Sequence, residues 1–399
     1  MNIRYSKIKT IIILTMLSMM GLLASDIYLP AVSKMKLFFH TTEANIQLTI
    51  GVYLLGLSLF QLIYGPLSDQ IGRKKIIIFG IVLYIVGSIG CSLSPNIYTL
   101  IAFRFVQSIG ACAGLVIGRA VISDIFPANE ITNIYNIIYP LVAASPAIAP
   151  IIGGYLVTYL AWHSNFIFIG IFGLVLLILF INFPETLTKQ KKSFLIKVLV
   201  SDYIDISKSI RFWGLTVMIC CVYSAWFIYL TQSPFIFMAK LSLQPKEVGY
   251  LYIPLALSIY MGNVLSKRIK KLFGIEVALY VGCGFFMYGA IALYISLNIF
   301  TVVSALQLIL PMALLAVSNG FILPLGIPSA ISLCSGKSGS ASGLVGFFQI
   351  CFSALSSSLI ANTLGISASI MSSSILVLAI SSIILYMTVK KISRQQITI

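Results

Sequence analysis

Long apolar stretches alternate with short polar breaks along almost the whole chain. Residues 76–93, for example, are apolar on every helical face, whereas strands of a membrane barrel would alternate with a period of two. A helix needs roughly 20 apolar residues to cross a bilayer. Breaks at Pro, Gly and charged residues then predict membrane-spanning helices at 9–29, 45–66, 76–93, 97–119, 133–159, 164–183, 212–234, 248–266, 275–296, 300–323, 339–361 and 367–389. The sequence therefore predicts an all-α membrane protein with twelve transmembrane helices.

The longest polar break, from Pro184 to about Arg211, divides these helices into two groups of six. We therefore expect an N-terminal six-helix bundle over residues 1–183 and a C-terminal six-helix bundle over residues 212–399. Residues 184–211 would form a cytoplasmic central loop between the bundles.

The two groups share weak sequence echoes in the same order. The segment 65–75 resembles 262–271, although Ser266 stands where the first half has Asp69. The segment 26–30, at the end of the first span, has a counterpart in 229–234, at the end of the seventh. Such echoes indicate duplicated, pseudo-symmetric halves, and a cavity between such halves is where a transporter holds its cargo.

Composition agrees with a membrane protein. A soluble domain carries about 25% charged residues, but this chain is 9% charged and 59% hydrophobic, with a net charge of +16 from 26 basic and 10 acidic residues. If both termini are cytoplasmic, most basic residues fall in cytoplasmic loops, as membrane topology favours. The basic residues expected in outer loops are Lys34, Lys36, Lys240 and Lys246. Topology and contact with membrane lipid thus explain the charge, and we expect no nucleic-acid partner.

Motifs for other kinds of chemistry are missing from the sequence. The seven cysteines fall mostly in apolar runs without CxxC spacing or neighbouring His, so we expect neither a metal site nor a disulfide. There is no GxxxxGK[ST] motif for ATP, and neither a Ser-His-Asp set nor an HExxH motif for hydrolysis. We therefore expect no cofactor and no enzymatic activity.

The fourth span carries a positive charge inside the membrane. Arg104 lies about 10 Å deep, at 1.5 Å per helical residue, where an unpaired guanidinium is costly. Gln107 and the small residues Gly114 and Gly118 share its helical face, which would allow close packing against another helix. Arg104 therefore needs a partner or a water-filled cavity.

Asp26 is the carboxylate that falls clearly inside an apolar span. Burial disfavours the charged form of a carboxyl group, whereas a nearby guanidinium favours it. We therefore expect Asp26, with Tyr28, Arg104 and Gln107 around a central cavity, to bind and release a proton as the protein changes conformation. The alternative is a static ion pair between Asp26 and Arg104 that only orders the bundle.

The loop predicted after the second span reads Gly-Pro-Leu-Ser-Asp-Gln-Ile-Gly-Arg-Lys-Lys over residues 65–75. Gly65 and Gly72 suit a tight turn because glycine adopts backbone geometry that other residues resist. This pattern, between the second and third of twelve spans, resembles the signature loop of the major facilitator superfamily.

The resemblance implies a latch on the cytoplasmic side. Asp69 would face the N-terminus of the eleventh helix near Ser338, because the positive end of a helix dipole favours a carboxylate. Arg73 would pair with Asp124 at the end of the fourth helix, a segment that also contains Arg119. The alternative is a basic loop that serves only membrane topology.

The fifth span contains a stretch similar to the antiporter motif of the same family, Gly-Pro-x-x-Gly-Gly. Here Ala149 replaces the first Gly, Pro150 would bend the helix, and Gly153 and Gly154 would allow tight packing. In the family this motif accompanies export in exchange for protons, although a Pro/Gly kink alone is common in membrane helices. Further stretches resemble the Bcr/CflA group of drug exporters: 26–31, 119–124, 149–154, 233–235 and 262–263.

Together these features predict a proton-coupled exporter of small amphipathic molecules in a bacterial inner membrane, acting as a monomer. The 20 Tyr and 25 Phe residues suit an amphipathic cargo better than a sugar, which needs many polar contacts. Three alternatives remain open: a dedicated exporter of one metabolite such as a siderophore or an amino-acid derivative, a proton symporter for uptake, and a membrane sensor or scaffold.

Overall fold

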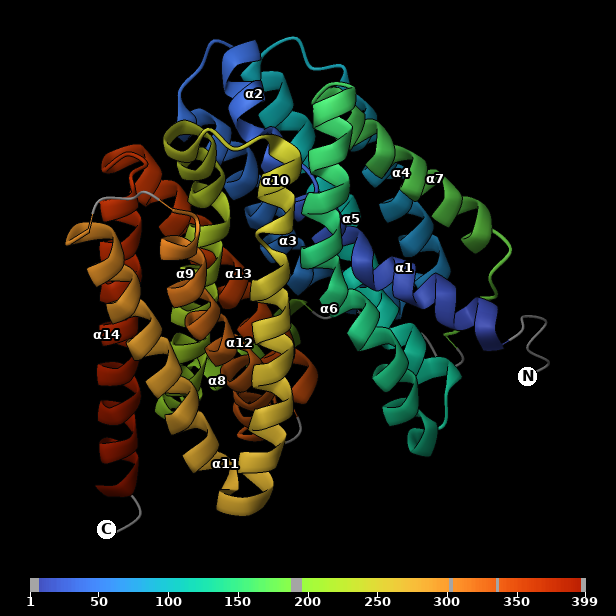
Figure 1. Ribbon diagram of the computed structural model, residues 1–399. Helices are drawn as coiled ribbons and strands as arrows, with labels where there is room; N and C mark the ends of the chain where they lie inside the picture. The colour runs from blue at the N-terminus through green and yellow to red at the C-terminus, as the bar shows by residue number, and fades with distance from the viewer. Residues whose placement is uncertain (1–6, 188–195, 301–303, 335–336, 396–399) are drawn as a thin grey trace.

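The structure is a computed structural model that describes residues 7–187, 196–300, 304–334 and 337–395. Within these ranges it is built from helices and their connections (Figure 1). The elements in chain order are α1 (Lys7–Asp26), η1 (Leu29–Ala31), α2 (Val32–Phe38), α3 (Glu43–Ile71), α4 (Arg73–Ser92), α5 (Ile97–Ile125), α6 (Ala128–Tyr159), α7 (His163–Phe180), α8 (Ile196–Ser207), α9 (Ile210–Leu241), α10 (Pro245–Tyr250), α11 (Ile253–Asn298), α12 (Leu306–Ser332), α13 (Ser338–Thr363) and α14 (Ala368–Gln395).

Short polar side chains fix where several helices begin. The Asn96 side chain accepts a hydrogen bond from the Thr99 backbone at 3.0 Å, and the Thr99 hydroxyl accepts one from the Asn96 backbone at 3.4 Å, which caps α5. Ser209 likewise accepts from the Phe212 backbone at 3.3 Å and caps α9. These bonds satisfy N–H groups that lack a partner within the first turn of a helix.

The predicted fold class is confirmed. Ten helical stretches among the described residues are long and apolar enough to cross a membrane. One of them, Pro245–Asn298, contains both the eighth and the ninth predicted spans, and the shorter apolar helix Ile148–Tyr159 belongs to the fifth. The stretches therefore account for the twelve spans expected from the sequence.

Three predicted boundaries are wrong, each for a local reason. The first span does not continue as one helix, because α1 ends at Asp26 and a short 3-10 turn follows. The loop expected from Gly65 is helical up to Ile71, and the basic loop expected after the eighth span is also helical. A single glycine makes each turn: Gly72 has a φ of +116° and Gly274 a φ of +86°, values that favour glycine.

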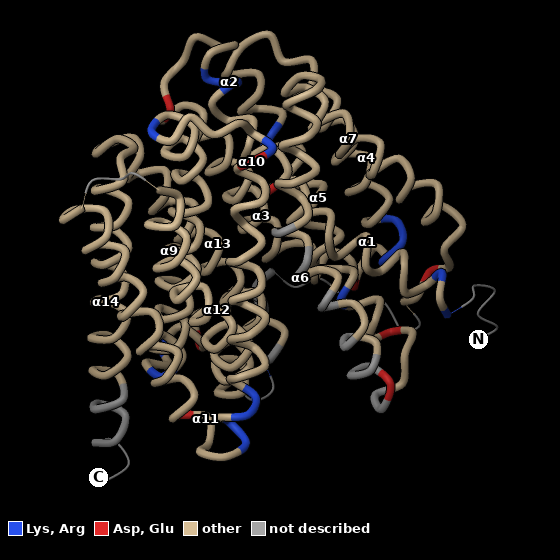
Figure 2. Tube along the Cα trace, viewed as in Figure 1, with Lys and Arg blue, Asp and Glu red and all other residues tan. Residues whose placement is uncertain are grey.

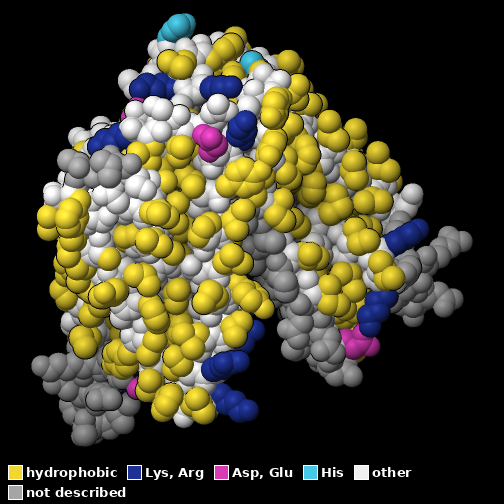
Figure 3. Space-filling model, viewed as in Figure 1, with side chains coloured by type: hydrophobic (Ala, Val, Ile, Leu, Met, Phe, Trp, Pro, Cys, Tyr) yellow, Lys and Arg dark blue, Asp and Glu magenta, His cyan; other side chains and the backbone are white. Residues whose placement is uncertain are grey.

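The helices form two groups that lie side by side (Figure 1): the N-terminal group contains α1 to α7, and the C-terminal group contains α9 to α14. Helix α3 of the first group lies against α13, and α6 lies against α10. We call the end with α2 and α10 the outer end, and the end with both chain termini the inner end. The groups are close at the outer end and diverge toward the inner end, where the surface is indented between them (Figure 3).

The surface matches a membrane-embedded protein. Figure 2 shows Lys and Arg gathered mainly toward the two ends of the bundle, including the turn of α11 at the inner end. Hydrophobic side chains cover most of the visible face between these ends (Figure 3). Lipid would therefore cover the apolar middle, while the charged ends lie in the headgroup regions and water.

Candidate functional site

Arg104 of α5 lies at the centre of the N-terminal group and is completely buried. Its guanidinium carbon lies 4.4 Å from the ring centroid of Tyr28, 4.1 Å from that of Tyr53 and 5.8 Å from that of Phe166. Desolvated cation–π contacts of this kind contribute about 2 kcal/mol or more. Aromatic faces therefore replace much of the hydration that the guanidinium loses on burial.

Hydrogen bonds hold the same guanidinium in place. Nη1 donates to the Ala24 carbonyl at 3.0 Å and to Gln107 Oε1 at 2.6 Å, and Nε donates to the Thr49 carbonyl at 3.4 Å. Gln107 Nε2 in turn donates to the Ser88 hydroxyl at 2.8 Å. Nη2 has no hydrogen-bond partner among the described residues. Arg104 thus keeps one donor nitrogen available although the side chain is fully buried.

Asp26 is the last residue of α1 and is 3% exposed. Its Oδ1 accepts a hydrogen bond from the Ser25 hydroxyl at 2.6 Å. The ion pair with Arg104 that the sequence left as the alternative is not formed: within the described part of the chain, the ion pairs do not include one between these two residues. The guanidinium instead lies between two tyrosine rings. The static ion pair is therefore absent from this conformation.

The structure brings the four predicted cavity residues, Asp26, Tyr28, Arg104 and Gln107, around the end of α1. The hydroxyls of Tyr28 and Thr49 are 3.2 Å apart and share a hydrogen bond. Sequence reasoning missed Tyr53, which contacts Arg104 and donates to the Gly21 carbonyl at 2.8 Å. Thr49 and Tyr53 are four residues apart on one face of α3, and that spacing could have indicated a polar site.

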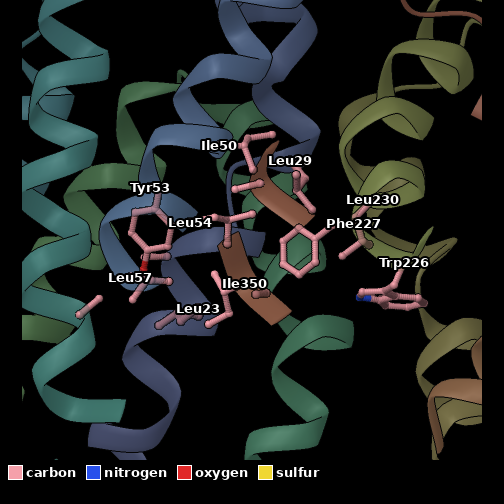
Figure 4. Close-up of a cluster of buried hydrophobic side chains, with 14 of the residues drawn as sticks. Leu23, Leu29, Ile50, Tyr53, Leu54, Leu57, Trp226, Phe227, Leu230 and Ile350 are labelled. Atoms are coloured by element: carbon pink, nitrogen blue, oxygen red, sulfur yellow. The ribbon is translucent and has the colours of Figure 1, made fainter. Parts of the chain in front are cut away.

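The C-terminal group faces this site with aromatic and aliphatic side chains. Figure 4 shows Phe227 and Leu230 of α9 opposite Leu29 and Leu54 of the N-terminal group, with Ile350 of α13 beside them. All five are buried. The side chains thus form an apolar layer where the two groups meet.

Polar contacts lie beside this layer. Gln47 Nε2 of α3 donates to Thr231 Oγ1 of α9 at 2.5 Å, which joins the two groups directly. The Asp26 charge also lies within electrostatic range of the phenols of Tyr223 and Tyr252 in the C-terminal group. The carboxyl group is therefore near the boundary between the groups and not on the lipid-facing surface.

At the inner end, Arg73 forms the centre of a charged cluster. It lies 2.5 Å from Asp69 Oδ1 and 3.1 Å from Asp124 Oδ2, and it donates to the Ser68 hydroxyl at 2.5 Å. The pair with Asp124 has the geometry that the resemblance implies. Asp69, in contrast, pairs with Arg73 of its own group, and the ion pairs of the described residues do not join it to the start of α13; the groups diverge at this end (Figure 1).

Two further residues expected in the latch have other surroundings. Gly65 lies within α3, and a Cβ added there would make only an ordinary contact with Val116 at 4.0 Å. Arg119 is exposed, and the ion pairs found in the described ranges do not include it. Gly65 is therefore not a turn residue, and Arg119 does not join the cluster around Arg73.

Glu185, which sequence reasoning left in a loop, supports this cluster. Its carboxylate accepts from the backbone N–H of Arg73 at 3.0 Å and of Lys74 at 3.2 Å. It therefore caps α4 at the positive end of the helix dipole. Thr186, the next residue, donates to Asp124 Oδ2 at 3.3 Å. The Pro-Glu-Thr sequence directly after an apolar span was the available signal.

The antiporter-like stretch of α6 lies against α10 of the other group. A Cβ added to Gly154 would lie 2.5 Å from the Pro245 carbonyl oxygen, and one added to Gly249 would lie 2.6 Å from the Pro150 carbonyl oxygen. Ala149 and Gly153 of the same stretch are buried. The two helices thus approach each other through reciprocal glycines.

Comparison with known proteins explains these features together. The profile of the Major Facilitator Superfamily matches residues 12–357. The chain belongs to the major facilitator superfamily. The chain is 29% identical over 332 residues to the chloramphenicol resistance protein of Pseudomonas aeruginosa, which covers 83% of this chain and 76% of the relative. It is 24% identical over 370 residues to the bicyclomycin resistance protein homolog of Haemophilus influenzae, with 91% of each chain covered.

A solved structure of another transporter shares the fold. The crystal structure of a D-xylose-proton symporter matches with a TM-score of 0.71 at 14% identity, over 94% of this chain and 97% of the other. A likeness at this identity concerns the fold alone. The protein is thus a transporter of the major facilitator superfamily, and its relatives named for drug resistance confirm the resemblance to drug exporters.

Proposed function

We propose that this transporter exports small amphipathic molecules across a bacterial cytoplasmic membrane in exchange for inward-moving protons. The observation that carries the proposal is the buried Asp26 carboxyl, held by the Ser25 hydroxyl at the end of α1. A buried carboxyl without a paired cation can gain or lose a proton when its surroundings change.

Arg104 would couple proton release to movement. Its Nη2 lacks a partner among the described residues, so it can receive a carboxylate without breaking a hydrogen bond. Proton release from Asp26 would become favourable when a rearrangement of α1 brings the carboxylate to this donor. Proton binding would release it again.

The apolar layer between the groups favours an amphipathic cargo. Phe227, Leu230 and Ile350 supply aromatic and aliphatic surface, and Gln47 and Thr231 supply hydrogen-bonding groups beside it. Sites of this composition bind molecules with large apolar surfaces and a few polar atoms. The relatives named for chloramphenicol and bicyclomycin resistance support the same class of cargo.

We further infer that residues 1–183 and 212–399 move as two bodies linked by residues 184–211, within a monomer. The inner end would face the cytoplasm, with both termini there, because most basic residues lie in the loops expected at that end. The divergence of the groups at the inner end would then correspond to an inward-open conformation (Figure 1).

The test is proton-driven export of chloramphenicol and of other amphipathic drugs into inverted membrane vesicles. Asp26→Asn keeps the size of the side chain but cannot release a proton, so we expect export driven by the pH gradient to fall by at least about tenfold. The matched control is Glu130→Gln, which removes the charge of an acid paired with Lys7 on the surface. Export that persists without a pH gradient, or a fully active Asp26→Asn variant, would contradict the proposal.

A further inference from the structure

The end of α1 poses a structural problem inside the membrane. A helix that ends there leaves carbonyl oxygens without backbone partners, and each unsatisfied group costs several kcal/mol in a nonpolar environment. Side chains from neighbouring helices supply the missing donors. Arg104 of α5 donates to the Ala24 carbonyl at 3.0 Å, and Asn165 of α7 donates through Nδ2 to the Ile27 carbonyl at 3.3 Å.

Asn165 is buried in the first turn of α7 and is completely inaccessible to solvent. Its bond reaches the residue that directly follows Asp26 in the chain. The next residue of α7, Phe166, packs its ring 5.6 Å from that of Tyr28. The start of α7 therefore contacts the two residues that directly follow α1, Ile27 and Tyr28.

Gly153 of α6 contacts the same carbonyl from another direction. A Cβ added to Gly153 would overlap the Ile27 carbonyl oxygen and would lie 2.7 Å from the carbonyl carbon. The adjacent Gly154 faces away, toward Pro245 of the other group. Of the two glycines in the antiporter-like stretch, one thus borders the end of α1 and the other borders the opposite group.

We propose that Asn165 is a positioning residue that, together with the space left by Gly153, fixes the Ile27 carbonyl and thereby the orientation of the Asp26 carboxyl group. Without the Asn165 donor, the Ile27 carbonyl must find another partner, and α1 can extend or unwind by part of a turn. Because Asp26 is the last residue of α1, either change rotates its carboxyl group relative to Arg104. The inference rests on the proposed role of Asp26 as proton carrier.

The charged and titratable groups around Asp26 come from several elements. They are Arg104 of α5, Tyr53 of α3, Tyr28 between α1 and η1, Tyr223 of α9 and Tyr252 before α11. Phenols remain neutral in the range where a carboxyl group titrates. A change in the protonation of Asp26 between variants would therefore report its distance from Arg104 and its burial.

The experiment follows the carbonyl-stretch infrared band of protonated carboxyl groups in the full-length protein in lipid, from about pH 5 to pH 9. The part of the band that disappears in Asp26→Asn belongs to Asp26. We expect Asn165→Leu, which removes the donor at similar size, to shift the midpoint of that band by at least about 0.5 pH unit. A merely structural role would lower the amount of folded protein and leave the midpoint of the folded fraction unchanged.

Gly153→Ala and Gly284→Ala form a matched pair, because each adds one methyl group to a helical glycine. Gly153→Ala displaces the Ile27 carbonyl and should also shift the midpoint, so it provides the test if Asn165→Leu fails to fold. Gly284→Ala adds a Cβ in α11 with no atom within 4 Å, and it should leave the midpoint unchanged. Midpoints of Asn165→Leu and Gly153→Ala that both equal the wild-type value would overturn the proposal.

Failure of the proposed function gives a different result. If the wild-type band contains no component that depends on Asp26, the proton-carrier role fails, and the positioning role fails with it. If that component is present and both variants leave its midpoint unchanged, only the positioning role of Asn165 and Gly153 is overturned.

Discussion

The outer and inner ends of the molecule are held by different kinds of contact. At the outer end the two groups touch through backbone: Gly154 lies against Pro245, and Gly249 lies against Pro150. At the inner end the strong contacts are ion pairs that stay within one group, such as that between Arg73 and Asp124.

This difference indicates how each end can open. A glycine contact depends on shape, makes no ion pair and can separate without leaving a charge unpaired. Charged side chains can exchange partners as the groups approach, because water can solvate an exposed carboxylate while it changes partner. Asp69, with 46% of its side chain exposed, could leave Arg73 and reach the start of α13. The outer end would therefore open and close through the shape complementarity of its glycine contacts. The inner end would open and close as its charged side chains exchange ion-pair partners.

The largest expected effect comes from filling the glycine contact. In Gly154→Leu the new side chain would meet the Pro245 carbonyl oxygen and the Lys246 Cα, which are backbone atoms that cannot rotate away. The outer end could not close, so the proposed drug export should fall by at least about tenfold. A cysteine introduced at Gln47 should also react faster with a membrane-impermeant thiol reagent added from the outer side.

The matched control for this variant is Gly284→Leu. Gly284 is an exposed glycine of α11, and no atom lies within 4 Å of a Cβ added there. Export by Gly284→Leu should remain close to the wild-type rate. Equal export by Gly154→Leu and Gly284→Leu would show that the outer end does not depend on this contact.

The elements of the fold could be predicted from the sequence, but their boundaries could not. Apolar runs locate helices because lipid burial decides them. A single glycine can turn the chain, however, and nothing in the apolar pattern shows that Gly274 alone makes the turn after a basic helical segment. When segment 65–75 is aligned with segment 262–271, Gly72 pairs with Ile269, which lies within α11. The turn of the second half lies at Gly274, so this alignment places the turn several residues too early.

The charged residues of the candidate site could be predicted from the sequence, because charged residues are rare inside membrane spans. Asp26 and Arg104 stand out because ionisable groups are costly in lipid. That these two residues do not form an ion pair could not be predicted. The guanidinium of Arg104 instead packs against the rings of Tyr28 and Tyr53, and aromatic residues are too common in the chain for these two to stand out. The contact of Asn165 with the Ile27 carbonyl could not be predicted either, because it depends on where α1 ends.

An intermediate effect is expected at the inner end. Arg73→Ala removes the partner of both Asp69 and Asp124. The two carboxylates then repel each other, so the free energy of unfolding should fall by about 1–2 kcal/mol. The loss is limited because both carboxylates are partly exposed. Thermal unfolding in detergent would measure it, and Lys75→Gln, an exposed basic residue of the same segment, is the control. A variant as stable as Lys75→Gln would show that the cluster contributes nothing in this conformation.

The smallest effect concerns α8, which is linked to the start of α13 by charge. Lys337 lies 3.0 Å from Asp202 and 2.9 Å from Asp205, and Lys208 lies 2.9 Å from Asp205. Hydrogen bonds from Lys208 and Lys337 lower the pKa of Asp205 to about 2. A lowered pKa means that the contact is complete above about pH 4, the ordinary range of an aspartate, and is lost only as the pH falls toward 2.

Because the pKa of Asp205 is lowered, its ion pairs with Lys208 and Lys337 should not change with pH under physiological conditions. Asp26, in contrast, is proposed to gain and lose a proton in this range. Asp205→Asn should therefore increase hydrogen–deuterium exchange in α8 by about twofold to fivefold, and by the same factor at pH 6 and pH 8 after correction for intrinsic exchange rates. Glu130→Gln, far from α8 in the sequence, should leave that exchange unchanged. If wild-type α8 lost protection between pH 8 and pH 6, Asp205 would have to titrate in that range, and the link between α8 and α13 would be a pH-dependent contact instead of a permanent one.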